Sequence, residues 1–484
     1  MSKYTEYKGL NLPNVAKEVL DNWEQNKVFE QSVSTRDGHK PFVFFEGPPS
    51  ANGLPGIHHV MGRAIKDIFC RYKTLKGYQV KRKAGWDTHG LPVELGVEKE
   101  LGITKEDIGK KITVEEYNNA CKEAVMRYTD IWNNLTKQMG YWVDMNDPYI
   151  TYENKYIESV WWLLGELYKK NLLYKGYTIQ PYSPAAGTGL SSHELNQPGC
   201  YKDVKDTTVV AQFKVKPNQQ FTQKLSGLTS LLEEGREVFF LAWTTTPWTL
   251  PSNTALAVGS KIDYVLVKTF NQYTNRPITV ILAKNLLSTY FGYDSYISAG
   301  GNSYADSYIQ KWLEGTTQLE NTYIERELGN EPTYSQFKQI IKEQGMPYRV
   351  LKEFKGSDLV GIQYEQLLPY ALPHENADKA FRVIAGDFVT TEDGTGIVHI
   401  APTFGADDAK VAKEAGVPPM LVLDENGNAV PLVDLQGRFI PEMGELAGKF
   451  VKNEYYNKGE EPEKSVDVEI VIKLKEENKA FKVE

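Results

Sequence analysis

Hydrophobic residues follow a helical spacing over much of the first part of the chain. This spacing predicts helices at 16–29 and 115–139, with short apolar strands and further amphipathic helices between them. Alternation of short strands with amphipathic helices is typical of an α/β layer with parallel strands. We therefore expect an α/β domain over residues 1–200.

The pattern changes between residues 201 and 450 to short apolar runs separated by turn residues. These runs lie at 209–215, 238–243, 264–268, 279–283 and 396–400. They predict a compact β-rich domain. Residues 451–484 are highly charged with a helical pattern near the end, and we expect them to return towards the first domain. The stretch 286–348 carries no chemistry that we can identify.

Length and composition indicate a soluble protein of two or three domains, with 484 residues, 41% hydrophobic and 24% charged. No apolar run reaches the roughly 18 residues of a membrane span, and residues 1–10 lack the apolar part of a secretion signal. We therefore expect a cytoplasmic protein without a membrane partner. The three cysteines are widely spaced, so they predict neither a disulfide framework nor a zinc site: Cys70, Cys121 and Cys200.

The net charge of −8 argues against a protein that coats nucleic acid indiscriminately. An RNA partner is still compatible with this charge, because phosphate contacts need only a local basic surface. The densest basic run, at 81–83, also fits an ordinary solvated surface.

A glycine-rich turn lies between a predicted strand and a predicted helix of the first domain. The apolar run 42–45 is expected to form a buried strand, and a helix is expected to begin near His59. The intervening residues 46–56 place free backbone N–H groups and a helix N-terminus where a phosphate can bind. A turn with a purely structural role fits the same pattern.

Polar side chains accompany this turn. His58 and His59 lie at the start of the helix, where they can donate to phosphate oxygens; a histidine there can instead cap the helix or pack against it. Asp87 follows a second short strand at 78–80 and is framed by glycines, which suits a side chain that holds a substrate ammonium group. The alternative is that Asp87 caps the following turn.

A second polar group lies in the β-rich part. Thr244, Thr245 and Thr246 end a strand that prolines stop, which places their hydroxyls where functional residues often lie. An edge strand with its hydroxyls in water fits as well. His399 and Asp408 follow another strand, and the Pro/Gly turn between them can bring them together. No Gly-x-Ser-x-Gly motif supplies a nucleophile, so a hydrolytic site here would use water as the attacking group.

Three motifs of the first domain resemble isoleucyl-tRNA synthetases of class I, and their eukaryote-like branch more than the common bacterial one. They are Gly-Pro-Pro at 47–49, Asn-Gly-Leu-Pro at 52–55 and Gly-Trp-Asp-Thr-His-Gly-Leu-Pro at 85–92. The segments around the threonines and around His399 resemble the editing domain of the same family. The resemblance implies the first half of a Rossmann-like catalytic core, interrupted by a β-rich editing (connective peptide) domain.

The resemblance also implies roles for residues of the synthetic site. Asp87 would hold the α-ammonium group of isoleucine, with Gly47, Pro48 and His89 as further amino-acid-binding residues. His58 and His59 would be catalytic. The expected ATP-binding residues are Gly47, Asn52, Gly53, Gly56, His58 and His59. The expected ligands are isoleucine, tRNA(Ile) and ATP with Mg²⁺, without zinc, on a monomer.

For the editing site, the resemblance implies that Asp408 anchors the amino group of a wrongly attached amino acid. Residues expected to line the pocket and contact the terminal adenosine are Thr244, Thr245, Thr246, Asn253 and His399. His399 would act as a size gate. Such a site is needed because one methylene is worth only about 1–3 kcal/mol of discrimination, for which isoleucyl-tRNA synthetase is itself the standard worked case.

The sequence departs from the family at the nucleotide signature. The family reads His-x-Gly-His, whereas residues 56–59 read Gly-Ile-His-His. A histidine at the third position adds a ring where the nucleotide would approach bare backbone. Three interpretations stay open: ATP binds in a rearranged way with His58 in the space left by Gly56, the site is impaired, or the exchange is a laboratory alteration.

The family's Lys-Met-Ser-Lys-Ser-type loop is also absent from the sequence. We therefore expect this polypeptide to be a fragment, or a chain whose remainder is not given, that does not complete activation by itself. The predicted function of the complete protein is ATP-dependent ligation of isoleucine to tRNA(Ile), with hydrolytic editing of Val-tRNA(Ile). The alternatives are a stand-alone editing deacylase and, less well supported by the threonine, His399 and Asp408 set, a tRNA-binding module without catalysis.

Overall fold

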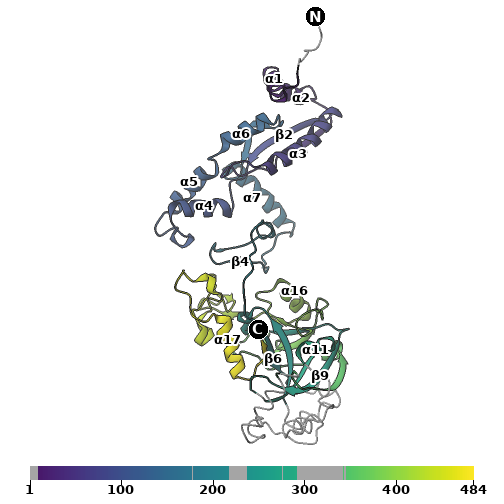
Figure 1. Cartoon of the computed structure of the whole chain (residues 1–484). Coiled ribbons are helices and arrows are strands. Elements are labelled where there is room, and N and C mark those ends of the chain that lie inside the picture. The colour runs from purple at the N-terminus through teal and green to yellow at the C-terminus, as the bar shows by residue number, and fades with distance from the viewer. Residues whose placement is uncertain (1–8, 177, 217–236, 275, 292–341, 343–344) are drawn as a thin grey trace. The chain divides into compact units, whose positions relative to one another are not determined.

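The computed structural model describes residues 9–176, 178–216, 237–274, 276–291, 342 and 345–484. The chain divides into two compact units, Met1–Gly176 and Tyr177–Glu484 (Figure 1). This division falls inside the predicted first domain, and the second unit includes residues 451–484. Most of the stretch 286–348 lies outside the described residues.

The first unit is built on three parallel strands in the order β1-β2-β3. They are β1 (Pro41–Phe45), β2 (Gln79–Trp86) and β3 (Asp144–Ile150). Helix α3 (Ile57–Leu75) connects β1 to β2, which pair in parallel from Pro41 opposite Gln79 onwards. The predicted α/β layer with parallel strands is confirmed.

Two predicted helices of this unit are each divided in the structure. The stretch 16–29 spans α1 and α2, which separate where Lys27 takes a left-handed conformation with φ 47°. The stretch 115–139 contains α5 and α6, separated by residues 126–128. The helices other than α3 are α1 (Leu12–Gln25), α2 (Val28–Ser34), η1 (Lys105–Asp107), α4 (Leu91–Leu101), α5 (Val114–Val125), α6 (Thr129–Gln138) and α7 (Asn154–Lys169).

The prediction that residues 42–45 form a buried strand is wrong as to burial. Val43 and Phe45 are 57% and 64% exposed, although both belong to β1. Among the described strands, β1 has β2 as its single neighbour, so its side chains are covered only in part. An apolar run predicts the strand correctly, but its burial depends on partners that the run does not specify.

The second unit contains a nine-stranded sheet among its described residues. The path β11-β9-β10-β7-β13-β8-β12 is extended by β6, which pairs with both β7 and β16. All five predicted apolar runs are strands of this sheet. The strands are β6 (Val209–Lys214), β7 (Val238–Thr244), β8 (Ala255–Val258), β9 (Asp263–Phe270), β10 (Pro277–Ala283), β11 (Arg349–Lys355), β12 (Arg382–Ala385), β13 (Ile397–Ile400) and β16 (Ala480–Val483).

Both faces of this sheet are buried. Along β7, Phe240 and Ala242 belong to one hydrophobic core, whereas Phe239 and Leu241 belong to another. A strand that is covered on both faces needs a nearly continuous apolar sequence, which is what residues 238–243 provide. Packing on both faces holds β7 in place, and with it the polar residues at its carboxyl end.

Smaller elements surround the sheet of the second unit. They are β4 (Tyr182–Ser183), β5 (Thr188–Gly189), α8 (Ser192–Leu195), η2 (Pro247–Ser252), η3 (Lys284–Leu286), α11 (Leu287–Tyr290), α15 (Gly356–Leu359), η4 (Ala377–Lys379), α16 (Ala406–Ala415), β14 (Val422–Leu423), β15 (Ala429–Val430), η5 (Pro441–Leu446), η6 (Asn453–Tyr455) and α17 (Val466–Glu476). In the part of the chain that the structure describes, no helix is both long and apolar enough to cross a membrane.

Candidate functional site

The turn after β1 is held in place by main-chain contacts from several segments. The Asp87 N–H, at the end of β2, donates to the Pro49 carbonyl oxygen at 3.0 Å. The Trp132 indole N–H donates to the Gly53 carbonyl oxygen at 2.9 Å. The turn that carries the predicted ATP-binding residues is therefore tied both to the loop that carries Asp87 and to α6.

The buried carboxylate of Glu46, directly after β1, lies at the start of the same turn. Glu46 is 3% exposed, and one of its oxygens lies 2.6 Å from the Lys66 ammonium group of α3. The Tyr141 hydroxyl donates to the other oxygen. A buried charge is tolerated only when it is paired and hydrogen-bonded, so these contacts stabilise Glu46 at the strand end.

The two histidines at the start of α3 differ in their surroundings. The Nδ1 atom of His59 accepts a hydrogen bond from the Gly56 N–H at 2.9 Å, so the neutral ring carries its proton on Nε2. Burial, and then the neighbouring His58 and Arg63, lower the pKa of His59. His58 is exposed, and its ring centroid lies 3.8 Å from that of His59.

Gly56 leaves space that His58 fills. A Cβ atom added to Gly56 would lie 2.8 Å from Cε1 and 3.0 Å from Nδ1 of His58. The His58 imidazole therefore lies where a side chain on residue 56 would begin. This is the placement that the first interpretation of the exchanged signature requires.

Asp87 and His89 lie at the end of β2. The Asp87 side chain is exposed and accepts a long 3.4 Å hydrogen bond from the His89 N–H. The His89 Nδ1 atom lies 3.0 Å from the Thr151 hydroxyl oxygen. This weak contact leaves the Asp87 carboxylate available to a cation. The alternative role of Asp87, capping the following turn, would rest on this long hydrogen bond.

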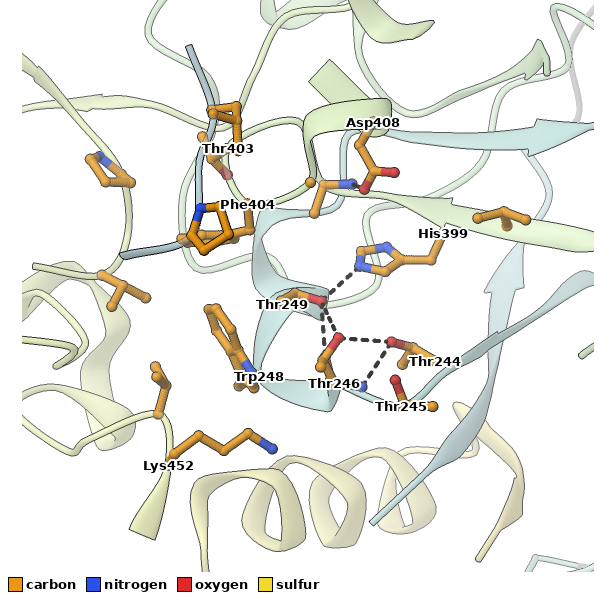
Figure 2. Close-up of a pocket in the computed structure, with 18 of the residues that line it drawn as sticks. Thr244, Thr245, Thr246, Trp248, Thr249, His399, Thr403, Phe404, Asp408 and Lys452 are labelled. Carbon is orange, nitrogen blue, oxygen red and sulfur yellow. Dashed lines mark hydrogen bonds between the residues drawn. The ribbon is translucent and has the colours of Figure 1, made fainter. Parts of the chain in front are cut away.

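The second unit contains a cavity of about 840 Å³ at the carboxyl ends of β7 and β13. Thr244 ends β7, His399 belongs to β13, and Asp408 lies in the first turn of α16 (Figure 2). Thr245 and Thr246 line the same cavity. Segments about 150 residues apart meet here because β7 and β13 pair in parallel, with Trp243 opposite Val398.

His399 is fixed through both ring nitrogens. Its Nε2 atom lies 3.0 Å from the Thr249 hydroxyl oxygen, and its Nδ1 atom lies 2.8 Å from the Asn253 amide nitrogen. Burial lowers the pKa of His399 from 6.5 to about 4. His399 is therefore a neutral, oriented part of the cavity wall at neutral pH.

Asp408 lines the cavity with its carboxylate group. The Ala401 N–H donates to its Oδ2 atom at 2.8 Å, and burial raises the pKa of the carboxyl group. Gly405 makes room for it, because a Cβ there would lie 2.7 Å from the Asp408 Cγ atom. A cationic group in the cavity would favour the ionised form and lower this pKa again.

An ion cluster around the buried Asp467 holds the threonine loop. The Lys452 ammonium group contacts Asp467 at 2.8 Å and Asp206 at 2.9 Å. The other oxygen of Asp467, whose side chain is 2% exposed, accepts a hydrogen bond from the Trp248 N–H at 2.8 Å. The helical segment 466–476 thus fixes the backbone that immediately follows the threonines.

A family model described as tRNA synthetases class I (I, L, M and V) matches residues 18–390. The chain belongs to this family of class I tRNA synthetases. Its whole length is 57% identical to an isoleucine–tRNA ligase of Cytophaga hutchinsonii, of which it covers 40%. It is likewise 56% identical over its whole length to the enzyme of that name from Bacteroides fragilis, of which it covers 39%.

This class I synthetase chain therefore spans about 40% of the length of these relatives. Among solved structures, the editing domain of the Plasmodium knowlesi (P. knowlesi) cytosolic leucyl-tRNA synthetase matches 44% of the chain, and the match covers 64% of that domain. It is 14% identical with a TM-score of 0.27, which is too low to support an argument. The two ligases named above come from bacteria, and the expected likeness to the eukaryote-like branch stays a prediction.

The structure brings together most, but not all, of the predicted editing residues of this synthetase. Asn253 does not belong to the cavity lining; it is 2% exposed and lies behind His399. Thr249, Trp248 and Lys452 do line the cavity and were not predicted. Thr249 lies three residues after the threonine run and could have been found there, whereas no local signal marks Lys452. Among the described residues, no group of three His, Cys, Asp or Glu side chains is placed to hold a metal ion.

Replacing Lys452 with Met should lower the free energy of unfolding by about 3 kcal/mol, because it leaves the Asp467 charge buried without a cation. Lys449→Met is the matched control: Lys449 also pairs with α17, through Glu469 at 2.6 Å, but both side chains are partly exposed. That loss should stay below about 1 kcal/mol. Urea denaturation of both variants measures the difference, and equal losses would contradict the role given to the cluster.

Protonation of His399 should make the fold less stable in mild acid. An unfolded histidine takes up its proton near pH 6.5, whereas the native side chain stays neutral down to about pH 4. Stability should therefore fall as the pH drops through this window. The difference in unfolding free energy between the wild type and His399→Gln should shrink by about 3 kcal/mol from pH 7 to pH 4. Denaturation at several pH values tests this, and a constant difference would show that His399 is not buried in its neutral form.

Proposed function

We propose that this chain is the part of an isoleucine–tRNA ligase that carries one half of the synthetic site and a complete editing pocket. The observation that supports this most strongly is the cavity of the second unit, where the threonines, His399 and Asp408 meet although they are distant in sequence. The high identity to isoleucine–tRNA ligases over the whole chain supports the choice of amino acid. The complete protein would use ATP with Mg²⁺ to activate isoleucine and transfer it to tRNA(Ile), as a cytoplasmic monomer.

In the proposed editing reaction, the Asp408 carboxylate binds the α-ammonium group of a valine that is wrongly attached to tRNA(Ile). Its half-buried position strengthens this ion pair, since fewer waters compete for the charges than at the surface. The threonine hydroxyls at the end of β7 orient the ester and the terminal ribose. Water is the proposed nucleophile, because His399 has both nitrogens engaged within the protein.

Asp408→Ala should reduce the hydrolysis of Val-tRNA(Ile) by this chain by roughly a hundredfold or more, because the ammonium group loses its partner. Asp407→Ala is the control: this neighbouring aspartate is exposed and does not belong to the cavity lining. Single-turnover deacylation measures both rates. Wild-type rates for Asp408→Ala, or equal losses for both variants, would remove Asp408 from the proposed site.

In the synthetic site, we propose that His58 takes the place of a side chain on residue 56. This is supported by the His58 ring, which occupies the space directly over Gly56. An imidazole there would still reach the nucleotide phosphates, and the exchange of residues 56 and 58 would be compensatory. Asp87, Gly47, Pro48 and His89 would bind isoleucine, and Asn52 and Gly53 would contact ATP.

Gly56→Ala in the full-length protein should lower kcat/KM for isoleucine-dependent ATP–pyrophosphate exchange by roughly tenfold, since the new methyl group displaces His58. The fold should persist, because only the end of a movable side chain must shift. Gly62→Ala, on the same helix and with nothing within 4 Å of the added carbon, is the control. Unchanged exchange in Gly56→Ala would contradict the proposed role of His58.

A deacylase without ligase activity is the second candidate, favoured by the altered signature at residues 56–59. The same exchange assay separates the two. Full-length protein that hydrolyses Val-tRNA(Ile) but catalyses no exchange would be a deacylase.

A further inference from the structure

Behind the wall of the cavity in the second unit lies a tyrosine that does not itself line the cavity. Tyr364 is completely buried, and its ring packs against those of Phe213 and Phe381. Its hydroxyl donates to the Asn253 Oδ1 atom at 2.6 Å. A hydroxyl group buried in an apolar core destabilises the fold unless it forms a hydrogen bond. The bond between Tyr364 and Asn253 therefore restrains both side chains.

The surroundings of Asn253 determine which way its amide points. The nitrogen lies 2.8 Å from the Ala255 carbonyl oxygen and 2.8 Å from the His399 Nδ1 atom. A carbonyl oxygen can only accept, so the amide nitrogen, and not the amide oxygen, must face Ala255. The amide oxygen then faces Tyr364, and the amide nitrogen donates to Ala255 and His399, with a longer contact of 3.5 Å to the Ile400 carbonyl oxygen.

This orientation also determines the tautomer of His399. Because Nδ1 accepts from Asn253, the neutral ring carries its hydrogen on Nε2 and donates it to the Thr249 hydroxyl oxygen at 3.0 Å. The Thr249 hydroxyl in turn donates to the Thr246 carbonyl oxygen at 2.9 Å. Each donor from Tyr364 to Thr249 therefore has an acceptor, and turning the imidazole would break the bonds of His399 to Asn253 and Thr249.

We propose that Tyr364 and Asn253 are positioning residues that hold His399 as its neutral Nε2–H tautomer, with the ring fixed in the cavity wall. A ring that cannot turn gives the cavity a definite width at this point. A definite width is what a site needs to admit valine and exclude an amino acid larger by one methylene. The tautomer follows from the contacts alone; only this consequence for substrate choice rests on the proposed editing function.

The direct test is nitrogen NMR of the chain labelled with ¹⁵N-histidine at neutral pH, with the His399 signals assigned from a His399→Gln variant. The wild type should show the Nε2–H tautomer. Tyr364→Phe should release the amide and give a mixture of tautomers or a broadened signal. Tyr264→Phe is the control, since Tyr264 is equally buried and its hydroxyl donates to the Gly396 carbonyl oxygen rather than towards His399.

A second variant tests the tautomer of His399 independently, in case Tyr364→Phe folds poorly. Asn253→Asp has the same shape but places a carboxyl oxygen between Nδ1 and the Ala255 carbonyl oxygen. In its protonated form this oxygen donates to Ala255 and accepts from Nδ1, so His399 should carry its proton on Nδ1. A wild-type ring that carries its proton on Nδ1, or variants that all keep the wild-type signals, would overturn the proposal.

Deacylation provides a separate measure of the consequence. Tyr364→Phe should raise the hydrolysis of Ile-tRNA(Ile) roughly tenfold relative to that of Val-tRNA(Ile), because the cavity wall has become movable. Tyr264→Phe should leave this ratio unchanged. If the wild type hydrolyses neither substrate, the proposed function fails while the tautomer result stands. If Val-tRNA(Ile) is hydrolysed but Tyr364→Phe keeps both the tautomer and the ratio, the inference fails alone.

Discussion

The parallel pairing of β7 with β13 is the constraint on which the second site depends. Parallel neighbours end at the same edge of a sheet, so Thr244 and His399 are brought together although about half of the unit lies between them in sequence. The side chains of β7 pack into hydrophobic cores on both faces, so a shift in its register would disrupt close packing on both sides of the sheet. The apolar core thus fixes the polar site at its edge.

In both units, the same type of interaction holds the backbone that follows a strand. A buried carboxylate pairs with a lysine and also accepts a hydrogen bond: Glu46 with Lys66 in the first unit, and Asp467 with Lys452 in the second. Such pairs contribute little net stability compared with apolar packing. Their value here is in orientation, since each supports a loop whose free N–H groups, hydroxyls or rings must face a ligand.

Much of this arrangement could be predicted from the sequence, because local patterns determine it. Apolar runs located the strands, and glycines, prolines and polar residues at strand ends located both sites. Burial of 42–45 was predicted wrongly, since coverage depends on neighbours rather than on the run. Contacts that span long separations left no local signal: Asn253 and Tyr364 are 111 residues apart and meet only in the folded sheet. For the same reason, Asn253 was predicted to line the pocket, whereas the residue lies behind His399.

The proposed function requires that the cavity of the second unit recognises valine and excludes isoleucine. The most direct measurement is calorimetric titration of the chain with adenosine that carries either amino acid through a non-hydrolysable 3′-amide bond. The valyl compound should bind at least roughly tenfold more tightly than the isoleucyl compound. Equal affinity for the two, or no binding of the valyl compound, would contradict the claim.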